Sequence, residues 1–327
     1  MPANLTPEYL AAEERFKEAR TSAEKIAAVE EMLRTIPKHK GTEKMQGNLK
    51  RRLSKLRREL HKKGGAKTAP PVYYVAREGA GQVALVGPAN TGKSSLLACL
   101  TRATPDIGDY PFTTRVPQPG MMKFENVQIQ LVDLPPLDAE FGEAWLPQAI
   151  RNADAAVVVV DLGSPDVLEQ ATNTLALLEN SKVVLGASTE PLPLGFVCKP
   201  TLLLGTKLDL PGTHDTWAVL RELWHARFEL HALSSVTREG TEEFRRAVFD
   251  LLGIVRVYTK APGKKPDQTA PFVLPRGATI RDVAERVHKD FGARLRFARV
   301  WGQGKFDGQM VQRDYRVEDN DVVELHL

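Results

Sequence analysis

Residues 82–100 read QVALVGPANTGKSSLLACL, and this stretch decides the fold of the chain. Residues 82–86 form a short apolar strand pattern, residues 87–94 match the spacing G-x-x-x-x-G-K-S, and residues 95–100 continue as a helix pattern. In such a strand–loop–helix unit the loop amides surround phosphate oxygens, the lysine adds positive charge, and the final hydroxyl can bind magnesium. The sequence therefore predicts a nucleotide site in an α/β domain with a mostly parallel sheet and helices on both faces. The predicted nucleotide contacts in this loop are Gly87, Pro88, Ala89, Asn90, Thr91, Gly92, Lys93, Ser94 and Ser95.

A second motif, at residues 201–209 (TLLLGTKLD), predicts which base is bound. An apolar strand pattern ends here in Thr206, Lys207 and Asp209. The carboxylate of Asp209 can accept from both the ring N–H and the exocyclic amine of guanine, whereas adenine offers neither arrangement. The aliphatic stem of Lys207 can cover the base, and a backbone N–H from the loop of Ser234, Ser235 and Val236 can reach the guanine oxygen. GTP is therefore predicted over ATP.

Two segments between these motifs are predicted to sense the third phosphate. Residues 110–115 (YPFTTR) supply hydroxyls, of which Thr114 is predicted to bind magnesium and to act in catalysis, with Thr113 as the alternative. The strand pattern at residues 127–132 ends at Asp133, which is predicted to hold magnesium through water. The other interpretation is that these residues are ordinary loop hydroxyls and an acid at a strand end.

Positive charge is concentrated near the N-terminus. The chain has a net charge of +4, but residues 38–67 contain 12 Lys or Arg and two Glu, a net charge of +10. Apolar residues recur at helical spacing over 26–36 and 45–60, which predicts an antiparallel helical hairpin with a basic face, followed by a linker at residues 62–71. This face is either a solvated helix surface or a salt-dependent contact with the phosphates of RNA or a ribosome.

Composition excludes several classes of protein. No apolar run approaches the roughly 20 residues that cross a bilayer, and the first residues lack the basic start and apolar core of a signal peptide. We therefore expect a cytoplasmic protein with no membrane partner. The two cysteines, Cys99 and Cys198, are too few for a disulfide framework and lack neighbours at metal-ligand spacing. Both are interpreted as packing residues.

With these motifs in place, the chain resembles the developmentally regulated GTP-binding proteins, a branch of the Obg-like translation-factor GTPases. The similarity rests on residues 38–60 and 110–114, and on the segments 257–260, 273–279, 300–302 and 319–323, which are similar to a TGS domain, a ubiquitin-like β-grasp unit. The resemblance implies a helical hairpin over 1–67, a GTP-binding domain over 68–253 and a TGS domain over 254–327. It also implies a slow Mg²⁺-dependent GTPase that contacts ribosomes or RNA through the hairpin and the TGS domain. A protein partner is a further expectation.

The chain departs from this family in the segment that follows Asp133. Only 73 positions separate Asp133 from Thr206, too few for the small domain that the family usually inserts there. The family motif Asp-x-x-Gly reads Asp-Leu-Pro-Pro over residues 133–136, and proline has no N–H to donate to a third phosphate. Leu137 follows where many small GTPases have a glutamine that orients the attacking water. Two functions stay open: a slow GTPase that acts as a switch, and a nucleotide-loaded RNA or ribosome adaptor with little turnover because of Pro136.

Asn90 has two interpretations. It resembles the asparagine with which potassium-stimulated members of the family help to hold a monovalent cation, K⁺, at the phosphates, where the cation can replace an arginine finger. The alternative is a loop residue that bonds to its own backbone.

Overall fold

The computed structural model describes residues 6–19, 22–37, 42–62, 73–103, 116–137, 143–186, 191–266 and 270–327. It divides the chain into two compact units, Met1–Pro71 and Val72–Leu327. The break lies four residues beyond the predicted boundary at residue 67. The predicted division of the second unit at residue 253 stays a prediction, although a six-stranded sheet precedes that residue and a five-stranded sheet follows it.

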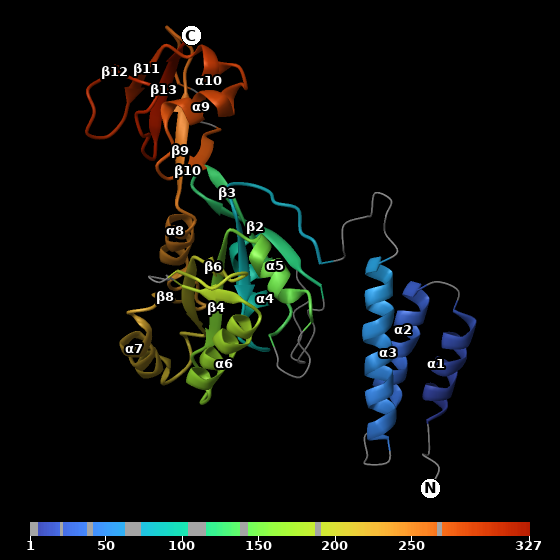
Figure 1. The fold of residues 1–327 in the computed structure, drawn as a ribbon. Coiled ribbons are helices and arrows are strands. Elements are labelled where there is room, and N and C mark those ends of the chain that lie inside the picture. Colours follow the sequence, from blue (N-terminus) through green and yellow to red (C-terminus); the bar gives the residue numbers. More distant parts are fainter. Residues whose placement is uncertain are drawn as a thin grey trace. The chain divides into compact units, whose positions relative to one another are not determined.

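The described part of the first unit consists of helices α1 (Pro7–Glu18), α2 (Ser22–Thr35) and α3 (Glu43–Lys62) (Figure 1). α1 begins at Pro7 because the hydroxyl of Thr6 accepts from the backbone N–H of Tyr9 at 3.2 Å. α2 and α3 pack against each other, as expected for the predicted hairpin, and α1 packs against α2 as a third helix. Their shared core is formed by Tyr9, Ala12, Val29, Met32, Ile36 and Leu49.

A six-stranded sheet organises the first part of the second unit. Its strands lie in the order β2-β3-β1-β4-β7-β8, and every neighbouring pair is parallel except β2 and β3. The mostly parallel sheet predicted from the sequence is therefore confirmed. The elements of this part are β1 (Gln82–Val86), α4 (Lys93–Leu100), β2 (Gln118–Phe124), β3 (Val127–Asp133), α5 (Leu146–Asn152), β4 (Ala155–Asp161), α6 (Val167–Asn180), β7 (Thr201–Thr206), α7 (Thr213–Trp224), β8 (Glu229–Ala232) and α8 (Thr241–Leu251).

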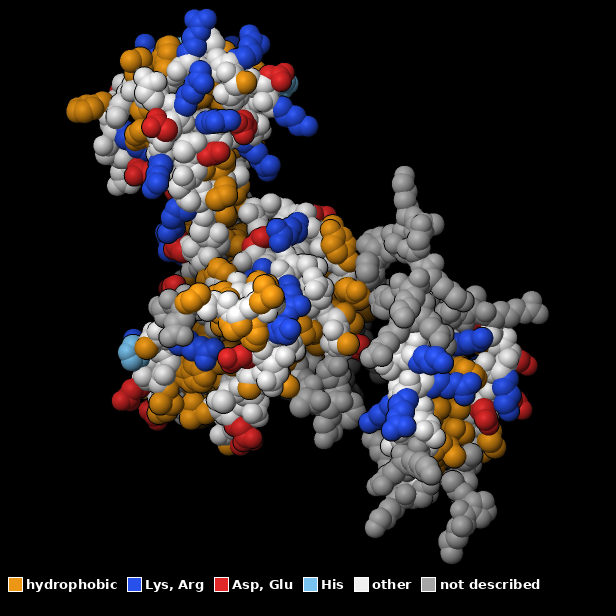
Figure 2. Space-filling model, in the orientation of Figure 1, with side chains coloured by type: hydrophobic (Ala, Val, Ile, Leu, Met, Phe, Trp, Pro, Cys, Tyr) orange, Lys and Arg blue, Asp and Glu red, His pale blue; other side chains and the backbone are white. Residues whose placement is uncertain are grey.

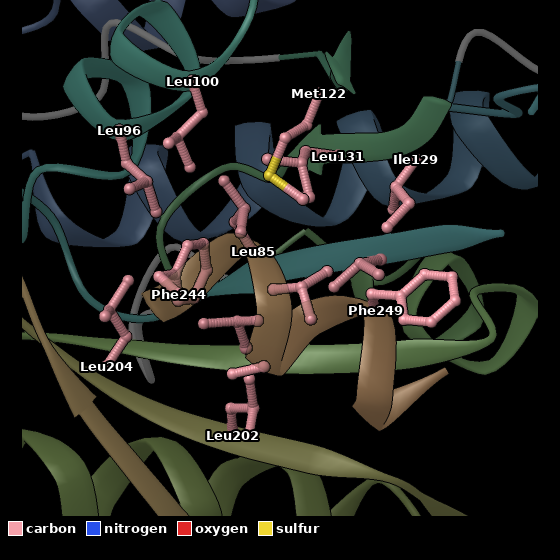
Figure 3. Packing of buried hydrophobic residues seen from close by; sticks show 14 of the residues in the cluster. Leu85, Leu96, Leu100, Met122, Ile129, Leu131, Leu202, Leu204, Phe244 and Phe249 are labelled. Carbon is pink, nitrogen blue, oxygen red and sulfur yellow. The ribbon is translucent and has the colours of Figure 1, made fainter. Parts of the chain in front are cut away.

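The sheet is covered on both faces, which explains why its central strands are apolar runs and not alternating patterns. One core joins the sheet to α4 and α8, where Leu96 of α4 and Phe244 of α8 lie near Met122 of β2 (Figure 3). The other core joins the opposite face to α5 and α6 through Leu146, Ile150 and other buried residues. Because both faces are buried, the site at the carboxyl ends of the strands stands on a rigid support.

The segment between α6 and β7 contains a short parallel strand pair. β5 (Val183–Leu185) pairs in parallel with β6 (Val197–Lys199). Two strands of three residues each are too short to show the alternation that predicts a strand.

A five-stranded sheet forms the end of the chain, with the strand order β10-β9-β13-β11-β12. The hydroxyl of Thr279 accepts from the N–H of Asp282, and the Asp282 carboxylate accepts from the N–H of Thr279, so that this capping box begins α9. α9 buries Ile280, Val283 and Ala284 against the sheet, while Val287 stays partly exposed. The elements are β9 (Ile254–Thr259), β10 (Phe272–Pro275), α9 (Ile280–Val287), α10 (Phe291–Arg294), β11 (Phe297–Trp301), β12 (Gln309–Val311) and β13 (Asp321–His326).

Arg256, on β9, links the five-stranded sheet to the six-stranded sheet. Its side chain is 4% exposed and donates to Asp319 at 2.6 and 3.0 Å and to the tip of the β2–β3 hairpin at Glu125 and Asn126. The bonds to Asp319 hold the pKa of Arg256 above its ordinary value. The guanidinium also lies over the ring of Phe249 at 4.9 Å. The β2–β3 hairpin, which joins the two predicted switch segments, is thus bonded to the five-stranded sheet.

No helix in the described part of the chain combines the length and the apolar character that a bilayer crossing requires.

Candidate functional site

The predicted phosphate loop connects β1 to α4 and has the backbone that a phosphate-binding loop needs. Gly92 has a φ of +84° and Asn90 a φ of +63°, both in the left-handed region that turns successive amides toward one side. A Cβ at Gly87 would collide with the carbonyl oxygen of Val159, so only glycine fits between the loop and β4. The loop is thus pressed against the sheet, and α4 presents its N-terminus to the same place.

Lys93 is folded onto this loop. Its amine donates to the carbonyl oxygens of Gly87 at 3.0 Å and Pro88 at 2.6 Å. Burial lowers the pKa of Lys93 to about 8, although the nearby charge of Asp133 acts in the opposite direction. The lysine therefore sits within the loop as a buried cation whose charge an anionic ligand would stabilise.

Ser94 and Asp133 come together although 39 positions separate them. The hydroxyl of Ser94 donates to the carboxylate of Asp133 at 2.5 Å, and Asp133 is fully buried at the end of β3. A hydroxyl and a carboxylate are hard oxygen ligands, which suit Mg²⁺. The donor set therefore fits the metal that the sequence predicts. Thr114 and its alternative Thr113 lie outside the described residues.

Thr206 connects the phosphate loop to the predicted base-recognition loop. Its hydroxyl, buried at the end of β7, lies 2.7 Å from the carbonyl oxygen of Thr91 in the phosphate loop and 3.0 Å from that of Val160 on β4. Two motifs that are 115 positions apart are thereby joined by one side chain. The sequence placed Thr206 at the site but did not reveal this contact.

The predicted base-recognition residues also converge. Asp209 is exposed, and its carboxylate accepts from the hydroxyl of Ser234 at 2.5 Å. The hydroxyl of Ser234 in turn accepts from the backbone N–H of Val236 at 3.1 Å, and the backbone N–H of Ser234 donates to the carbonyl oxygen of Glu239 at 3.0 Å. Two of the three predicted loop amides are thus engaged within the loop, which leaves the N–H of Ser235 as the candidate for the guanine oxygen. Lys207 has a φ of +60° and forms an ion pair with Asp161 at 2.6 Å.

Asp161 is a site residue that sequence reasoning missed. It ends β4 directly beside Thr206 and accepts from Lys207. The signal that could have found it was its position, because an acid that ends an apolar strand in a parallel sheet lies at the edge where ligands bind. The stretch 155–161 (AAVVVVD) has this form.

The second predicted switch segment leaves the sheet at Asp133. Leu134 is buried, and the backbone N–H of Leu137 donates to the carbonyl oxygen of Gly87 at 3.2 Å. Leu137 also packs against the core that includes α5 and α6. The segment is therefore attached to the first residue of the phosphate loop.

The two cysteines noted in the sequence, and two ring side chains of the C-terminal part, have local packing partners. Cys99 and Cys198 are partly buried, and the thiol of Cys198 donates to the carbonyl oxygen of Gly186 at 2.9 Å. His288 is exposed beside Phe291, and Trp301 is partly buried under the amine of Lys260. Among the described residues, no three His, Cys, Asp or Glu side chains are grouped as metal ligands would be.

The described part of α3 carries a basic face. Figure 2 shows Lys and Arg side chains gathered over this unit, and Lys50, Arg51, Arg52 and Lys55 are all exposed. Arg52 lies over the ring of Phe16 on α1 at 4.3 Å. Arg57 and Arg58, which the sequence adds to this face, have side chains outside the described residues.

Comparison with protein families matches both parts of the second unit. A family model described as 50S ribosome-binding GTPase matches residues 82–188, and a TGS domain model matches residues 255–327. The first match covers the phosphate loop and Asp133, and the second coincides with the five-stranded sheet and α9. The α/β and β-grasp classes predicted from the sequence are therefore confirmed.

Curated relatives match along nearly the whole chain. An uncharacterized GTP-binding protein of Methanocaldococcus jannaschii is 29% identical over 92% of this chain and 92% of its own length. Developmentally-regulated GTP-binding protein 1 of Xenopus laevis is 28% identical over 92% and 98%, and Ribosome-interacting GTPase 1 of Saccharomyces cerevisiae is 28% identical over 93% and 99%. Among solved structures, a GTP binding protein from Pyrococcus horikoshii shares the fold, with a TM-score of 0.50 and 18% identity over 75% of this chain and 99% of that chain.

Proposed function

This chain is a homologue of the developmentally regulated GTP-binding proteins with a GTPase domain and a TGS domain, and we propose that it is a slow, magnesium-dependent GTPase of the cytoplasm. It binds GTP, hydrolyses it to GDP, and its nucleotide state controls its association with a ribosome or RNA. The relatives' names describe GTP binding and, in one case, ribosome interaction, which supports both halves of the proposal.

One observation carries the choice of a guanine nucleotide. Thr206 bonds to the phosphate loop and begins the Thr-Lys-x-Asp motif, so a phosphate site and a carboxylate suited to guanine belong to one rigid frame. In this frame Lys93 and the loop amides stabilise phosphate charge, Ser94 and Asp133 hold Mg²⁺, and Asp209 selects guanine. Thr114, which lies outside the described residues, is the further magnesium ligand that the sequence predicts. No side chain in the described part of the site is placed as an obvious general base, which fits slow hydrolysis.

The ribosome contact is supported by the basic face of α3 and by the TGS domain. Exposed lysine and arginine side chains release counterions when they bind phosphates, so this attachment is expected to weaken as salt rises. Asn90 is exposed with a left-handed backbone, and a K⁺ ion beside it stays part of this proposal. A higher hydrolysis rate in KCl than in NaCl at equal ionic strength would support the ion.

Co-sedimentation with ribosomes tests the proposal directly. The purified protein is centrifuged with ribosomes at moderate salt in the presence of a non-hydrolysable GTP analogue, GDP or no nucleotide. We expect the GTP analogue to bring down more protein than GDP or no nucleotide. Equal binding in all three states would contradict nucleotide control, and no binding in any state would contradict the ribosome contact.

A second candidate function is favoured by the two prolines at residues 135 and 136. Without an N–H at Pro136, the chain can be an adaptor that binds guanine nucleotide permanently and turns over little GTP. Pro136→Gly separates the two functions. The switch predicts only a modest change in the rate of GTP hydrolysis, whereas the adaptor predicts a large gain.

A further inference from the structure

The segment that follows Asp133 has unusual backbone chemistry. Residues 134–137 read Leu-Pro-Pro-Leu, and neither proline can donate a hydrogen bond. The first backbone donor that follows Leu134 is therefore the N–H of Leu137. Each proline also has its φ held near −65°, and a residue that precedes a proline favours extended backbone. The two prolines thus form a stiff connection that carries this amide away from β3.

The amide of Leu137 is aimed at the phosphate loop. It donates to the carbonyl oxygen of Gly87 at 3.2 Å, and the amine of Lys93 donates to the same oxygen at 3.0 Å. Two donors that share one acceptor at these distances lie close to each other. The Leu137 amide is therefore a near neighbour of the cation that the site directs at phosphate oxygens.

The shared acceptor is fixed in place. Gly87 follows β1 directly and is pressed against Val159 of β4, and both strands are buried in the centre of the sheet. The carbonyl oxygen of Gly87 thus cannot follow the amide if the second switch moves. An anionic phosphate oxygen is a stronger acceptor than this neutral carbonyl, because hydrogen bonds to charged groups are roughly twice as strong.

We propose that the backbone amide of Leu137 is the donor to the third phosphate of GTP, and that it exchanges the carbonyl oxygen of Gly87 for that phosphate. The donor lost at Pro136 is replaced one residue further along the chain. With GDP there is no third phosphate, so the amide stays on Gly87. The apolar side chain of Leu137 takes no part in this exchange. The inference rests on the proposed function, since it requires that the site binds GTP.

The test removes the N–H and keeps the side chain. Leu137 is replaced by its α-hydroxy analogue, which converts the amide between residues 136 and 137 into an ester. The affinities of the full chain for GDP and for the β,γ-imido analogue of GTP are then measured with Mg²⁺ present. We expect the ester to weaken binding of the triphosphate analogue about five- to tenfold, because a charge-assisted bond is lost, and to change GDP binding by less than about twofold.

Three further variants make the result specific. Leu137→Pro also lacks the N–H and is expected to lose affinity for the triphosphate analogue, whereas Leu137→Ala keeps the N–H and the wild-type ratio of the two affinities. Pro136→Gly supplies a new amide, and in the ester background it is expected to restore triphosphate binding. The thermal unfolding temperature of each nucleotide-free variant shows that it is folded.

Two outcomes would overturn the inference, and a different one would overturn the function beneath it. If the ester weakens both nucleotides equally, or weakens neither, Leu137 is not the donor to the third phosphate. If the wild-type chain binds neither GDP nor the triphosphate analogue, the proposed function itself fails. The wild-type measurement therefore distinguishes the two failures.

Discussion

The proposed selection of guanine rests on one carboxylate, that of Asp209. Because Ser234 donates to one of its oxygens, the carboxylate is oriented before any base arrives. Asp209→Asn replaces one accepting oxygen with an NH₂ donor, which opposes the donors of guanine. We expect guanine nucleotide to lose at least about tenfold in affinity relative to adenine nucleotide, the value of a bond to a charged group. Competition between GDP and ADP for the site measures this ratio.

The matched control for this prediction is Asp215→Asn. Asp215 is an exposed acid in the first turn of α7, close in sequence but without a predicted contact to the base. It is expected to leave the ratio of GDP to ADP affinity unchanged. A guanine preference that survives Asp209→Asn would remove Asp209 from base selection.

At the scale of elements, the end of β7 and the phosphate loop act as one body because of Thr206. Thr206→Val keeps the shape of the side chain but removes the hydroxyl that bonds to Thr91 and Val160. It leaves these buried carbonyl oxygens without that donor, so we expect GDP affinity to fall roughly tenfold. Titration with fluorescent GDP checks the change.

Thr206→Ser is the control, because it keeps the hydroxyl and loses only a methyl group. We expect its affinity for GDP to stay within about threefold of wild type, since the bonds to both carbonyl oxygens are retained. Equal losses in the serine and valine variants would mean that packing of the methyl group, and not the hydroxyl, maintains the site.

At the scale of the whole molecule, Arg256 connects the second sheet to the first, and Asp319 holds its side chain in place. Burial acts to raise the pKa of Asp319, but the bonds from Arg256 outweigh it and hold the pKa below its usual value of 3.8. The folded pKa is depressed, so this carboxylate stabilises the protein above about pH 4 and the stabilisation is lost as pH falls through the folded pKa. Asp319→Asn should lower the free energy of unfolding by about 1.5–3 kcal/mol at pH 7, since Arg256 loses its charged partner at this position and keeps only Glu125 and Asn126.

Urea unfolding at pH 7 and at pH 3 checks this expectation. The difference between wild type and Asp319→Asn is expected to narrow at pH 3, where the wild-type carboxyl begins to protonate. Asp314→Asn, at an exposed position of the same part of the chain, serves as the control and should change stability by less than about 0.5 kcal/mol. A difference that is the same at both pH values would show that the charge of Asp319 is not what stabilises the contact.

The basic face of α3 is expected to govern attachment to the ribosome through charge alone. Arg51→Glu with Lys55→Glu should reduce co-sedimentation with ribosomes. The slope of the logarithm of the binding constant against the logarithm of the salt concentration should also become shallower, by about 0.7–0.9 for each phosphate that is no longer neutralised. Lys17→Glu with Arg34→Glu alters the same charge on α1 and α2 and is expected to have less effect. Equal losses from the two pairs would assign the effect to net charge and not to the face of α3.

The predicted elements were those with strong local patterns. The unit from β1 to α4 follows from an apolar strand, a glycine-rich loop and an apolar helix in direct succession, and the start of α9 follows from the capping box at Thr279. By contrast, β5 and β6 are too short to carry a period, and β11 and β12 were not predicted as strands. Their pairing depends on partners elsewhere in the chain.

The sequence by itself determined the residue types on which the proposed chemistry depends: a phosphate loop, the carboxylate proposed to select guanine, a basic helix and the two prolines that remove backbone donors. These are properties of residue type and spacing, which do not depend on contacts with distant segments of the chain. Only the tertiary structure decided which groups meet. Thr206 reaches Thr91, Leu137 reaches Gly87, and Arg256 reaches Glu125, each over a long separation in sequence. Such contacts depend on how strands are ordered in a sheet, and strand order is set by burial of the whole core and not by any single segment.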